Sequence, residues 1–377
     1  MANQATVLDQ PHGPLVIKDI PVPQCHPTEV LVKVRAVATN AADWKIYEGH
    51  FPQVLPVLLG CDVAGEVAEV GRSVVGLNVG DRVCSRVFQV KCFLTCRQVA
   101  GFTQQQLVGM ESMMAIGSVA SDLRHGGYQK FVPMLPRMIF KIPESVPNEI
   151  ATTFGCSFFT AAAGVFKSLG FPFPIPEVAS VEKVLVWGAA SAVGAFVVQL
   201  LKASHMEVIA VCSAKNFDYI RNLGASHVID YHGTDVAAQL REQRIRVKKA
   251  FDSISSLETC NACLDIVGEG GTVADVQFLE ALRRPGIGME HINVVDILGE
   301  AVSFSHRKEG ATNDTKNSQQ APLLSPLVND WVPNGLVAGI LKGVQYQIYS
   351  GGLNSIDQAI RDHRDGKIAG KAVITGI

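Results

Sequence analysis

The sequence Val184-Leu-Val-Trp-Gly188-Ala-Ala-Ser191-Ala-Val-Gly194 joins a short apolar run to a turn of small residues. We expect residues 184–187 to form a buried parallel strand, because strands covered on both faces are apolar throughout. The apolar run that starts at Ala195 predicts a helix to about His205. A tight turn between a strand and a helix leaves backbone N–H groups and the positive end of the helix dipole facing one point. The stretch therefore predicts a site for the pyrophosphate of a dinucleotide.

The turn matches the dinucleotide fingerprint G-x-G-x-x-G only in part, because Ser191 stands where the middle glycine would be. The Ser191 hydroxyl could instead donate a hydrogen bond to a phosphate oxygen. The alternative interpretation is a tight strand-to-helix turn that binds no ligand. On the first interpretation, the residues that hold the pyrophosphate are Gly188, Ala190, Ser191, Ala192, Val193 and Gly194.

The end of the next expected strand, residues 207–212, predicts which nicotinamide dinucleotide binds. An acidic residue at this point binds the ribose hydroxyls of NAD and repels the 2′-phosphate of NADP. Here the chain continues Ser213-Ala-Lys215-Asn216, which offers a hydroxyl, an ammonium and an amide but no carboxylate. The sequence therefore favours NADPH as the cofactor. In the alternative interpretation Ser213 caps the helix expected over residues 216–223, and both roles can hold together.

Length and composition set the class of protein. The chain has 377 residues, which suggests two domains. It is 47% hydrophobic and 18% charged with a net charge of −2 and no basic patch, so we expect a globular protein without a nucleic-acid partner. The longest apolar runs are short or interrupted, so we expect no membrane span. The N-terminus has no basic segment followed by a long apolar one, so we expect a cytoplasmic protein whose nine cysteines are reduced thiols.

The N-terminal 84 residues are rich in β-strand patterns. Residues 15–20 and 29–38 alternate apolar and polar side chains, as half-exposed strands do. Three compact signals follow, and their glycines around an alternating strand predict a tightly bent β-barrel wall. The signals are Asn40-Ala-Ala-Asp43-Trp44-Lys45, Gly60-Cys-Asp62-Val-Ala-Gly65-Glu-Val-Ala-Glu-Val-Gly71 and Gly80-Asp-Arg-Val83.

In order and spacing, these signals and the turn at residues 188–194 resemble the medium-chain dehydrogenase/reductase superfamily. More narrowly, the chain resembles its zinc-independent fungal branch, which includes the trans-acting enoyl reductases of polyketide synthases (lovastatin type). The stretches that carry this closer likeness are Cys212-Ser213-Ala-Lys-Asn216-Phe-Asp218, Leu223-Gly-Ala225-Ser-His-Val-Ile-Asp230-Tyr231 and Lys167-Ser-Leu-Gly170-Phe-Pro172-Phe-Pro174.

The resemblance implies an α/β fold with two domains. Residues 1–165 and 318–377 are expected to form a GroES-like β-barrel catalytic domain. Residues 166–317 are expected to form a Rossmann domain that binds NADPH. The sequence of this second segment agrees, because strand patterns alternate with helix patterns in it, which indicates a doubly wound parallel sheet.

The residues aligned with zinc ligands do not favour a metal site. Zinc-dependent relatives supply Cys and His ligands at positions that align with Ala41-Ala42 and Gly60-Cys61-Asp62. The first cysteine is absent, and Cys61 or Asp62 replaces the histidine, whereas a catalytic zinc needs three protein ligands. Cys84, Cys92 and Cys96 have the spacing C-x7-C-x3-C, which does not fit a structural zinc site. We therefore expect no metal.

The reaction expected without a metal is hydride transfer to the β-carbon of an activated C=C bond, in an enoyl thioester or an enone. The resulting enolate needs charge stabilisation and a proton. Lys45 aligns with a lysine that lies near the nicotinamide in the trans enoyl reductases, and it is the first catalytic candidate. Its alternatives are a solvated surface lysine or a residue that orients the cofactor. Thr160 is the second candidate, as a hydrogen-bond partner of a carbonyl or the carboxamide, unless it bonds back to its own helix.

Further cofactor contacts are expected on both domains. Asp43 and Trp44 are expected to shape the loop under the nicotinamide. The resemblance implies that Tyr231 contacts the adenosine end and that Lys371 lies near the phosphates, the alternative for Lys371 being an ordinary edge-strand lysine. Phe278 and Leu279 follow the fifth expected strand of the cofactor domain, at the carboxyl edge where ligands bind, so we expect them to touch the nicotinamide. Cys156 has no histidine near it in the sequence, so we interpret it as a packing residue.

Two segments depart from the pattern. Residues 86–124 show neither clean periodicity nor turn chemistry, whereas compact relatives have a much shorter loop there. One hypothesis is that this segment is not native coding sequence, which sequencing of the spliced transcript tests; a native segment is expected to cover or crowd the cleft. Residues 305–320 are polar throughout and predict a mobile loop.

Three functions stay open at the level of the sequence. The leading one is an NADPH-dependent enoyl reductase of fungal specialised metabolism, whose substrate is a small molecule or a chain held on a carrier protein of a polyketide synthase. The second is a free-standing quinone or enone reductase. The third is a non-catalytic NADPH-binding accessory protein, disabled by residues 86–124.

Overall fold

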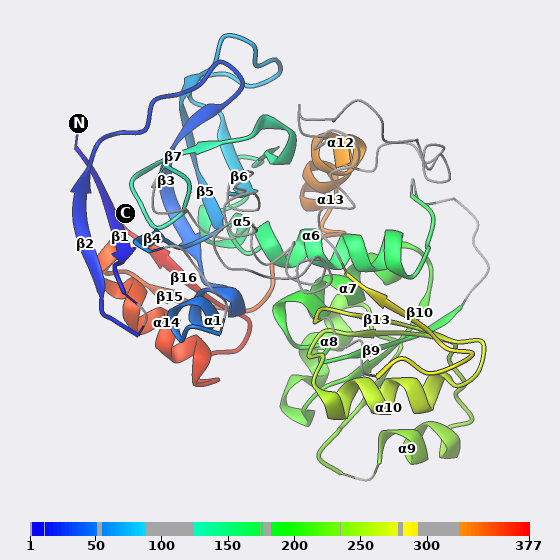
Figure 1. Ribbon diagram of the computed structural model, residues 1–377. Coiled ribbons are helices and arrows are strands. Elements are labelled where there is room, and N and C mark those ends of the chain that lie inside the picture. The colour runs from blue at the N-terminus through cyan, green and yellow to red at the C-terminus, as the bar shows by residue number, and fades with distance from the viewer. Residues whose placement is uncertain are drawn as a thin grey trace, which may run out of the picture.

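The computed structural model describes residues 2–10, 12–50, 55–87, 124–173, 175, 182–233, 235–277, 282–292 and 324–377. Within these residues the chain forms a β-rich domain and a second domain built on a parallel sheet (Figure 1). The predicted positions Phe278 and Leu279, the segment 305–320 and nearly all of the segment 86–124 lie outside the described residues. The predicted domain boundary at 317/318 lies outside them too.

The described strands are β1 (Asn3–Leu8), β2 (Leu15–Ile20), β3 (Val30–Ala38), β4 (Val57–Leu58), β5 (Asp62–Val70), β6 (Arg82–Arg86), β7 (Phe131–Met134), β8 (Phe140–Lys141), β9 (Lys183–Trp187), β10 (Glu207–Val211), β11 (His227–Ile229), β12 (Lys249–Asp252), β13 (Thr272–Asp275), β14 (Gly288–His291), β15 (Tyr346–Tyr349) and β16 (Lys371–Thr375).

The described helices are α1 (Ala41–Tyr47), α5 (Asn148–Ala151), α6 (Gly155–Ala163), α7 (Ala192–Ala203), α8 (Phe217–Leu223), α9 (Val236–Glu242), α10 (Leu257–Val267), α12 (Leu324–Pro326), α13 (Val332–Val337) and α14 (Ile356–Arg364), with short helical turns η1 (Pro136–Met138), η2 (Gly164–Ser168), η3 (Ala214–Asn216), η7 (Leu327–Trp331) and η8 (Gly352–Ser355).

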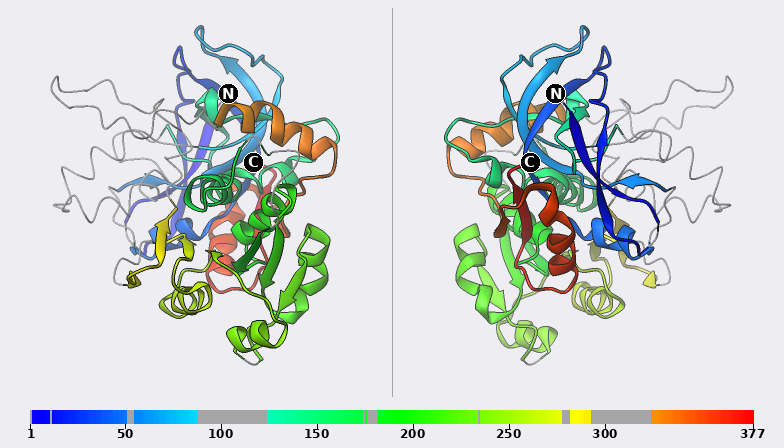
Figure 2. Two further views of the ribbon diagram at one scale, coloured as in Figure 1. Left: turned by 90° about the vertical axis from the view of Figure 1, so that its right-hand side faces the viewer. Right: turned by 90° about the vertical axis from the view of Figure 1, so that its left-hand side faces the viewer.

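The β-rich domain is held together by strands from both ends of the chain. Its larger sheet runs β15-β16-β3-β5-β6-β8, with β7 also paired to β3, and a smaller sheet runs β2-β1-β4. The C-terminal strand β16 pairs with β3, so the red end of the chain lies against the blue strands in Figure 2. A Cβ on Gly65 in β5 would lie 2.2 Å from the carbonyl oxygen of Lys33 in β3. The glycine therefore permits the close strand approach that a bent barrel wall needs.

The parallel sheet has the order β11-β10-β9-β12-β13-β14, and every pair along it is parallel. The chain starts this sheet in its middle with β9, builds outward through β10 and β11, and then returns to add β12 on the other side. This is the Rossmann arrangement, in which a ligand crevice opens at the carboxyl ends of the two strands where the order reverses. Here those strands are β9 and β12.

Alternate residues of β9 belong to two apolar cores, as expected of a strand buried on both faces. Val184 and Val186 pack in the core that contains residues of α7 and α8. Leu185 packs in the core that contains residues of α9 and α10. The helices therefore cover both faces of the sheet (Figure 1), and β9 is fixed in the centre of the domain, with its carboxyl end free for a ligand.

Helix α6 lies between the two domains and packs on α7 through phenylalanines (Figure 1). The rings of Phe154 and Phe196 lie 4.7 Å apart, and Phe158 meets Phe196 edge to face at 5.6 Å. Within the described residues, one helical stretch, Asn148–Ser168, is long and apolar enough to cross a membrane by length and composition alone. The most apolar window of this stretch is 78% buried inside the protein, as core helices of soluble proteins are.

The predicted α/β fold with a GroES-like domain and a Rossmann domain is confirmed. Helix α7 begins three residues earlier than predicted, because Ser191 caps it directly after the turn. Strand β14 (Gly288–His291) was not predicted. Its sequence Gly-Met-Glu-His lacks the β-branched and aromatic residues that mark strands, and its pairing with β13 comes from tertiary contact.

Candidate active site

The turn between β9 and α7 has the shape of an anion cradle. Gly188 has φ +70°, a conformation that favours glycine. A Cβ on Gly194 would lie 2.4 Å from the Gly188 carbonyl oxygen, so only glycine lets the helix start this close to the turn. The α7 N-terminus therefore presents its unsatisfied N–H groups to the crevice, which fits a pyrophosphate.

The Ser191 hydroxyl is engaged within the turn. Its oxygen accepts a hydrogen bond from the N–H of Gly194 at 3.0 Å and its proton is directed to the Ser253 hydroxyl, also at 3.0 Å. Ser253 follows β12 and donates in turn to the Trp187 and Gly188 carbonyl oxygens, at 2.7 and 2.9 Å. In this state Ser191 acts as a helix cap rather than as a phosphate donor. Sequence reasoning missed Ser253, because its link to the turn spans more than sixty residues of chain.

A cavity of about 960 Å³ opens between the two domains and reaches the α7 N-terminus. A second cavity, of about 990 Å³, continues along the outer edge of the Rossmann sheet and shares Ala190, Ser191, Ser213 and Asn216 with the first. Together they give the long groove that a dinucleotide needs. The predicted residues that line one or both cavities are Trp44, Lys45, Thr160, Gly188, Ala190, Ser191, Ala192, Val193, Ser213, Lys215, Asn216, Tyr231 and Lys371.

The end of β10 carries the residues predicted to choose the dinucleotide. The Ser213 hydroxyl donates to the Tyr231 hydroxyl at 3.2 Å, so the two predicted contacts are brought together. Asp230, which the sequence argument did not weigh, lies beside them at the end of β11. Its carboxylate accepts hydrogen bonds from the backbone N–H of His232 at 3.0 Å and from the His232 ring at 2.9 Å. These bonds hold the pKa of Asp230 below its usual value.

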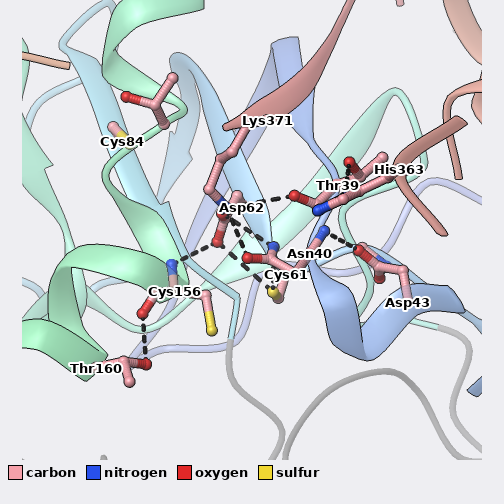
Figure 3. A network of polar contacts seen from close by, with 12 residues as sticks. Thr39, Asn40, Asp43, Cys61, Asp62, Cys84, Cys156, Thr160, His363 and Lys371 are labelled. Carbon is pink, nitrogen blue, oxygen red and sulfur yellow. Dashed lines mark hydrogen bonds and ion pairs between the residues drawn. The ribbon is translucent and has the colours of Figure 1, made fainter. Parts of the chain in front are cut away.

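Lys371 is buried in the barrel wall rather than extended toward a phosphate. Its ammonium forms an ion pair with Asp62 and donates to the Asn40 side-chain oxygen at 2.6 Å and the Thr39 carbonyl at 3.3 Å (Figure 3). Both charged side chains are about 99% buried or more. Burial alone would lower the pKa of Lys371, but the charge of Asp62 raises it. These three contacts account for the three ammonium protons. Lys371 therefore also differs from an ordinary edge-strand lysine, whose ammonium would be solvated.

Asp43 lies under the cleft and does not line it. Its carboxylate accepts the backbone N–H of Asn40 at 2.6 Å and that of Gly60 at 3.2 Å, which ties the start of α1 to the connection between β4 and β5. Burial raises the pKa of Asp43 to about 7. The predicted role in shaping the loop agrees with this position, but direct contact with the cofactor does not, because the side chain is fully enclosed.

Lys45 and Thr160 both line the cleft, Lys45 from α1 and Thr160 from α6. Burial lowers the pKa of the Lys45 ammonium, which lies 5.7 Å from the centre of the Trp44 ring. The Thr160 hydroxyl donates to the Cys156 carbonyl at 2.8 Å, which is the back-bonding alternative. With its proton directed into the helix, Thr160 offers the cleft an acceptor oxygen, which suits a carboxamide N–H₂ better than a carbonyl.

The residues at the zinc-ligand positions do not form a metal site. Cys61 and Asp62 lie beside Asn40, which donates to the Cys61 sulfur at 3.2 Å and to the Asp62 carboxylate at 3.0 Å. The Lys371 ammonium already neutralises Asp62. In the described part of the chain, no three His, Cys, Asp or Glu side chains are grouped so that they could hold a metal ion. The donor set thus fits an ion-paired polar network and does not fit a bound zinc.

Two family profiles match the chain in the order of its domains. The profile described as "Alcohol dehydrogenase GroES-like domain" matches residues 26–144, and the profile described as "Zinc-binding dehydrogenase" matches residues 192–315. The second match begins at the first residue of α7 and includes strands β10 to β14 of the parallel sheet. The chain belongs to the medium-chain dehydrogenase/reductase superfamily. Its Rossmann domain is accordingly the nicotinamide-dinucleotide-binding domain of an oxidoreductase of this superfamily.

Within this superfamily, the chain resembles fungal trans-enoyl reductases. It is 27% identical over 378 residues to trans-enoyl reductase ACTTS2 of Alternaria alternata, with 99% of each chain covered. It is also 27% identical over 384 residues to a trans-enoyl reductase of Gibberella fujikuroi, covering 98% of this chain and 97% of the other. The near-complete coverage means that these proteins and this chain have about the same length.

Solved structures show the same fold at lower identity. An alcohol dehydrogenase superfamily protein from Novosphingobium aromaticivorans superposes with a TM-score of 0.74 at 22% identity, over 100% of both chains. A quinone oxidoreductase from Pseudomonas syringae superposes with a TM-score of 0.72 at 20% identity, also over 100% of both chains. At such identities the likeness establishes the two-domain fold of the superfamily and no particular substrate.

Proposed function

We propose that this protein is an NADPH-dependent reductase of activated C=C bonds, and that it acts in trans as an enoyl reductase on chains held by a polyketide synthase. The observation that carries the proposal is the interdomain cleft, which connects the anion cradle at α7 to a pocket lined by Lys45 and Thr160. The resemblance to fungal trans-enoyl reductases supports the substrate class. In this proposal the protein works in the cytoplasm, beside the synthase that supplies its substrate.

The residues of the cleft suit the proposed chemistry. The bound dihydronicotinamide would supply a hydride to the β-carbon of the enoyl group. Lys45 then stabilises the negative charge on the thioester oxygen, and it can give up a proton readily because burial lowers the pKa of its ammonium. Thr160 holds the carboxamide through its acceptor oxygen, which fixes the face of the ring that meets the substrate.

The choice of NADPH follows from the end of β10. Lys215 and Asn216 line the cleft there, beside the Ser213–Tyr231 pair. An ammonium, an amide and hydroxyls can bind a 2′-phosphate, whereas a carboxylate would repel it. Asp230 is the nearby carboxylate, and its Oδ1 is engaged by hydrogen bonds from the backbone N–H and the ring of His232.

A second candidate is a free-standing quinone or enone reductase. The same cleft would suit it, because a quinone or an enone also accepts a hydride at an activated C=C bond and places negative charge on an oxygen that Lys45 can stabilise. The two candidates share the cofactor site and differ only in the electrophile that enters beside Lys45.

The experiment that separates the candidates follows the oxidation of the reduced dinucleotide by its absorbance. The purified chain is given crotonyl-N-acetylcysteamine thioester or a naphthoquinone, each with NADPH or with NADH. Reduction of the thioester with NADPH preferred supports the enoyl reductase. Reduction of the quinone alone moves the second candidate to first place, and a preference for NADH overturns the argument from Ser213 and Lys215. Lys45→Met is expected to lower turnover of the thioester while leaving NADPH binding in place.

A further inference from the structure

Two cysteine thiols meet at the floor of the cleft. Cys61 directly precedes β5, and Cys156 lies in the first turn of α6. Asp62 connects them, because one of its carboxylate oxygens accepts the backbone N–H of Cys156 at 2.6 Å and lies 3.6 Å from the Cys61 sulfur. The pKa of each thiol is shifted by the other, and Figure 3 shows both sulfurs beside the Asp62 carboxylate.

The frame around the two sulfurs is tightly fixed. A Cβ on Gly155 would lie 2.1 Å from an Asp62 oxygen, so only glycine lets the start of α6 lie this close to the first residue of β5. Asn40 donates to both the Cys61 sulfur and the Asp62 carboxylate. The ion pair between Asp62 and Lys371 anchors the carboxylate from the other side. The fold therefore fixes the two chain segments that carry the sulfurs on either side of one carboxylate.

The two thiols differ in access and in charge. Cys156 lines the interdomain cavity, whereas Cys61 is fully buried behind it. The hydrogen bond from Cys61 lowers the pKa of Cys156 to about 6, burial opposes this shift, and the nearby charge of Arg86 supports it. The same contact, with burial, raises the pKa of Cys61 well above its usual value. The pair thus consists of an accessible thiolate and an enclosed thiol, which is the arrangement of an attacking and a resolving cysteine.

We propose that Cys61 and Cys156 form a peroxide-sensitive dithiol that closes to a disulfide in the floor of the cleft. The Cys156 thiolate attacks one oxygen of a hydroperoxide, the O–O bond breaks, and Cys156 becomes a sulfenic acid while the other oxygen leaves as water or an alcohol. The Cys61 sulfur then attacks the Cys156 sulfur, the S–O bond breaks, and a second water leaves with the Cys61 proton. Two electrons pass from the two thiols to one peroxide.

The disulfide would alter the site without touching the cofactor cradle. Cys156 carries the carbonyl that accepts the Thr160 hydroxyl, and Cys61 is bonded to Asn40, which also lines the cleft. Oxidation is therefore expected to lower turnover reversibly. The proposal does not depend on which electrophile the enzyme reduces, because the sulfur chemistry needs only the peroxide.

The test uses the full chain with reduced thiols, hydrogen peroxide as the probe and peptide mass spectrometry as the readout. After exposure, remaining thiols are alkylated with iodoacetamide and the protein is digested without reductant. We expect a linked pair of peptides containing Cys61 and Cys156, lighter by two hydrogen atoms and separated again by dithiothreitol. Alkylation of both residues under conditions that oxidise Cys25, a partly exposed thiol outside the cleft, would overturn the proposal. So would linkage of Cys156 to a different cysteine.

Variants assign the two roles. In Cys61→Ser, the linked pair is lost and Cys156 accumulates as a sulfenic acid that dimedone captures. In Cys156→Ser, Cys61 stays unmodified because peroxide cannot reach it. Cys25→Ser is the matched control and is expected to form the linked pair like the unaltered chain. Equal dimedone labelling of Cys61 and Cys156 in the two single variants would contradict the assigned roles. The linked peptides of the unaltered chain test the disulfide itself, even if a variant folds poorly.

Discussion

Lys371 and Asp62 form a buried ion pair in the barrel, and each side chain neutralises the charge of the other. They are separated by 309 positions in the sequence, which is why the sequence placed Lys371 near a phosphate and gave Asp62 no partner. The family resemblance pointed to Lys371, whereas Asp62 was noted only as a residue at a zinc-ligand position. The pairing itself depends on β16 joining the sheet beside β3, which in turn pairs with β5, and no local pattern encodes that arrangement.

Lys371→Met tests this pair through stability. The substitution leaves the Asp62 carboxylate buried without a counter-charge, so we expect a loss of about 3–5 kcal/mol in the free energy of unfolding. Urea denaturation followed by circular dichroism measures it. Lys367→Met, in the turn just before β16 where the side chain is exposed, is the matched control and should leave stability nearly unchanged. Adding Asp62→Asn to Lys371→Met should recover part of the loss; no recovery would show that the charge is not the cause.

Asp43 predicts a pH dependence of stability. Its pKa is raised from 3.8 in the unfolded chain to about 7 in the folded one, so the folded state holds the proton more tightly. The stabilisation from this group is present below about pH 4 and is lost as the pH rises through 7, a change on the order of 4 kcal/mol. The difference in unfolding free energy between the unaltered protein and Asp43→Asn should therefore fall over this range. A difference that stays constant with pH would contradict the raised pKa.

At the scale of elements, the turn between β9 and α7 was the feature most readable from sequence, because strand, glycines and cap lie within a dozen consecutive residues. Strand β14 and the hydrogen bonds of Ser253 to the turn could not be predicted from the sequence, because both depend on residues that are distant in the chain. The same holds for the proximity of Cys61 and Cys156, because the sequence argument treated Cys156 as a packing residue and Cys61 only as a replacement for a zinc ligand. Local chemistry was thus predictable where the site is built from one segment.

Gly194→Ala tests the turn. The added Cβ would meet the Gly188 carbonyl oxygen at 2.4 Å, so the start of α7 must move away from the cradle. We expect a loss of about 1–3 kcal/mol in stability and a marked loss of dinucleotide affinity, measured by fluorescence titration with NADPH. Gly233→Ala is the control, because a Cβ there meets no atom within 4 Å. Unchanged NADPH affinity in Gly194→Ala would show that the pyrophosphate binds elsewhere.

Lys215→Ala tests the element that selects the dinucleotide, the tip of β10. Removal of one charge-assisted hydrogen bond to the 2′-phosphate should weaken NADPH binding by about 10- to 150-fold, since such bonds contribute about 1.5–3 kcal/mol. NADH lacks this phosphate, so its affinity should not change. Isothermal titration with both dinucleotides measures the ratio, with Lys202→Ala at the far end of α7 as the control. Equal weakening for both dinucleotides would place Lys215 elsewhere on the cofactor.

At the scale of the whole molecule, the site exists because two domains share one cleft. The barrel contributes Lys45 and the network of Lys371, α6 contributes Thr160 and Cys156, and the Rossmann domain contributes the cradle. The sequence order of the domain motifs was sufficient to predict this architecture, whereas the shape of the cleft required the packing of α6 on α7. The substrate is set by the part of the cleft farthest from the cradle, and the fold alone does not choose between thioester and quinone.

The most direct test of the central claim is the fate of the transferred hydrogen. The purified chain is incubated with an α,β-unsaturated acyl thioester and NADPH that carries deuterium at the transferable position of C4, and the product is examined by nuclear magnetic resonance. The account predicts one deuterium at the β-carbon and a solvent-derived proton at the α-carbon. A saturated product without deuterium at the β-carbon, or no saturated product while a quinone is reduced, would contradict it.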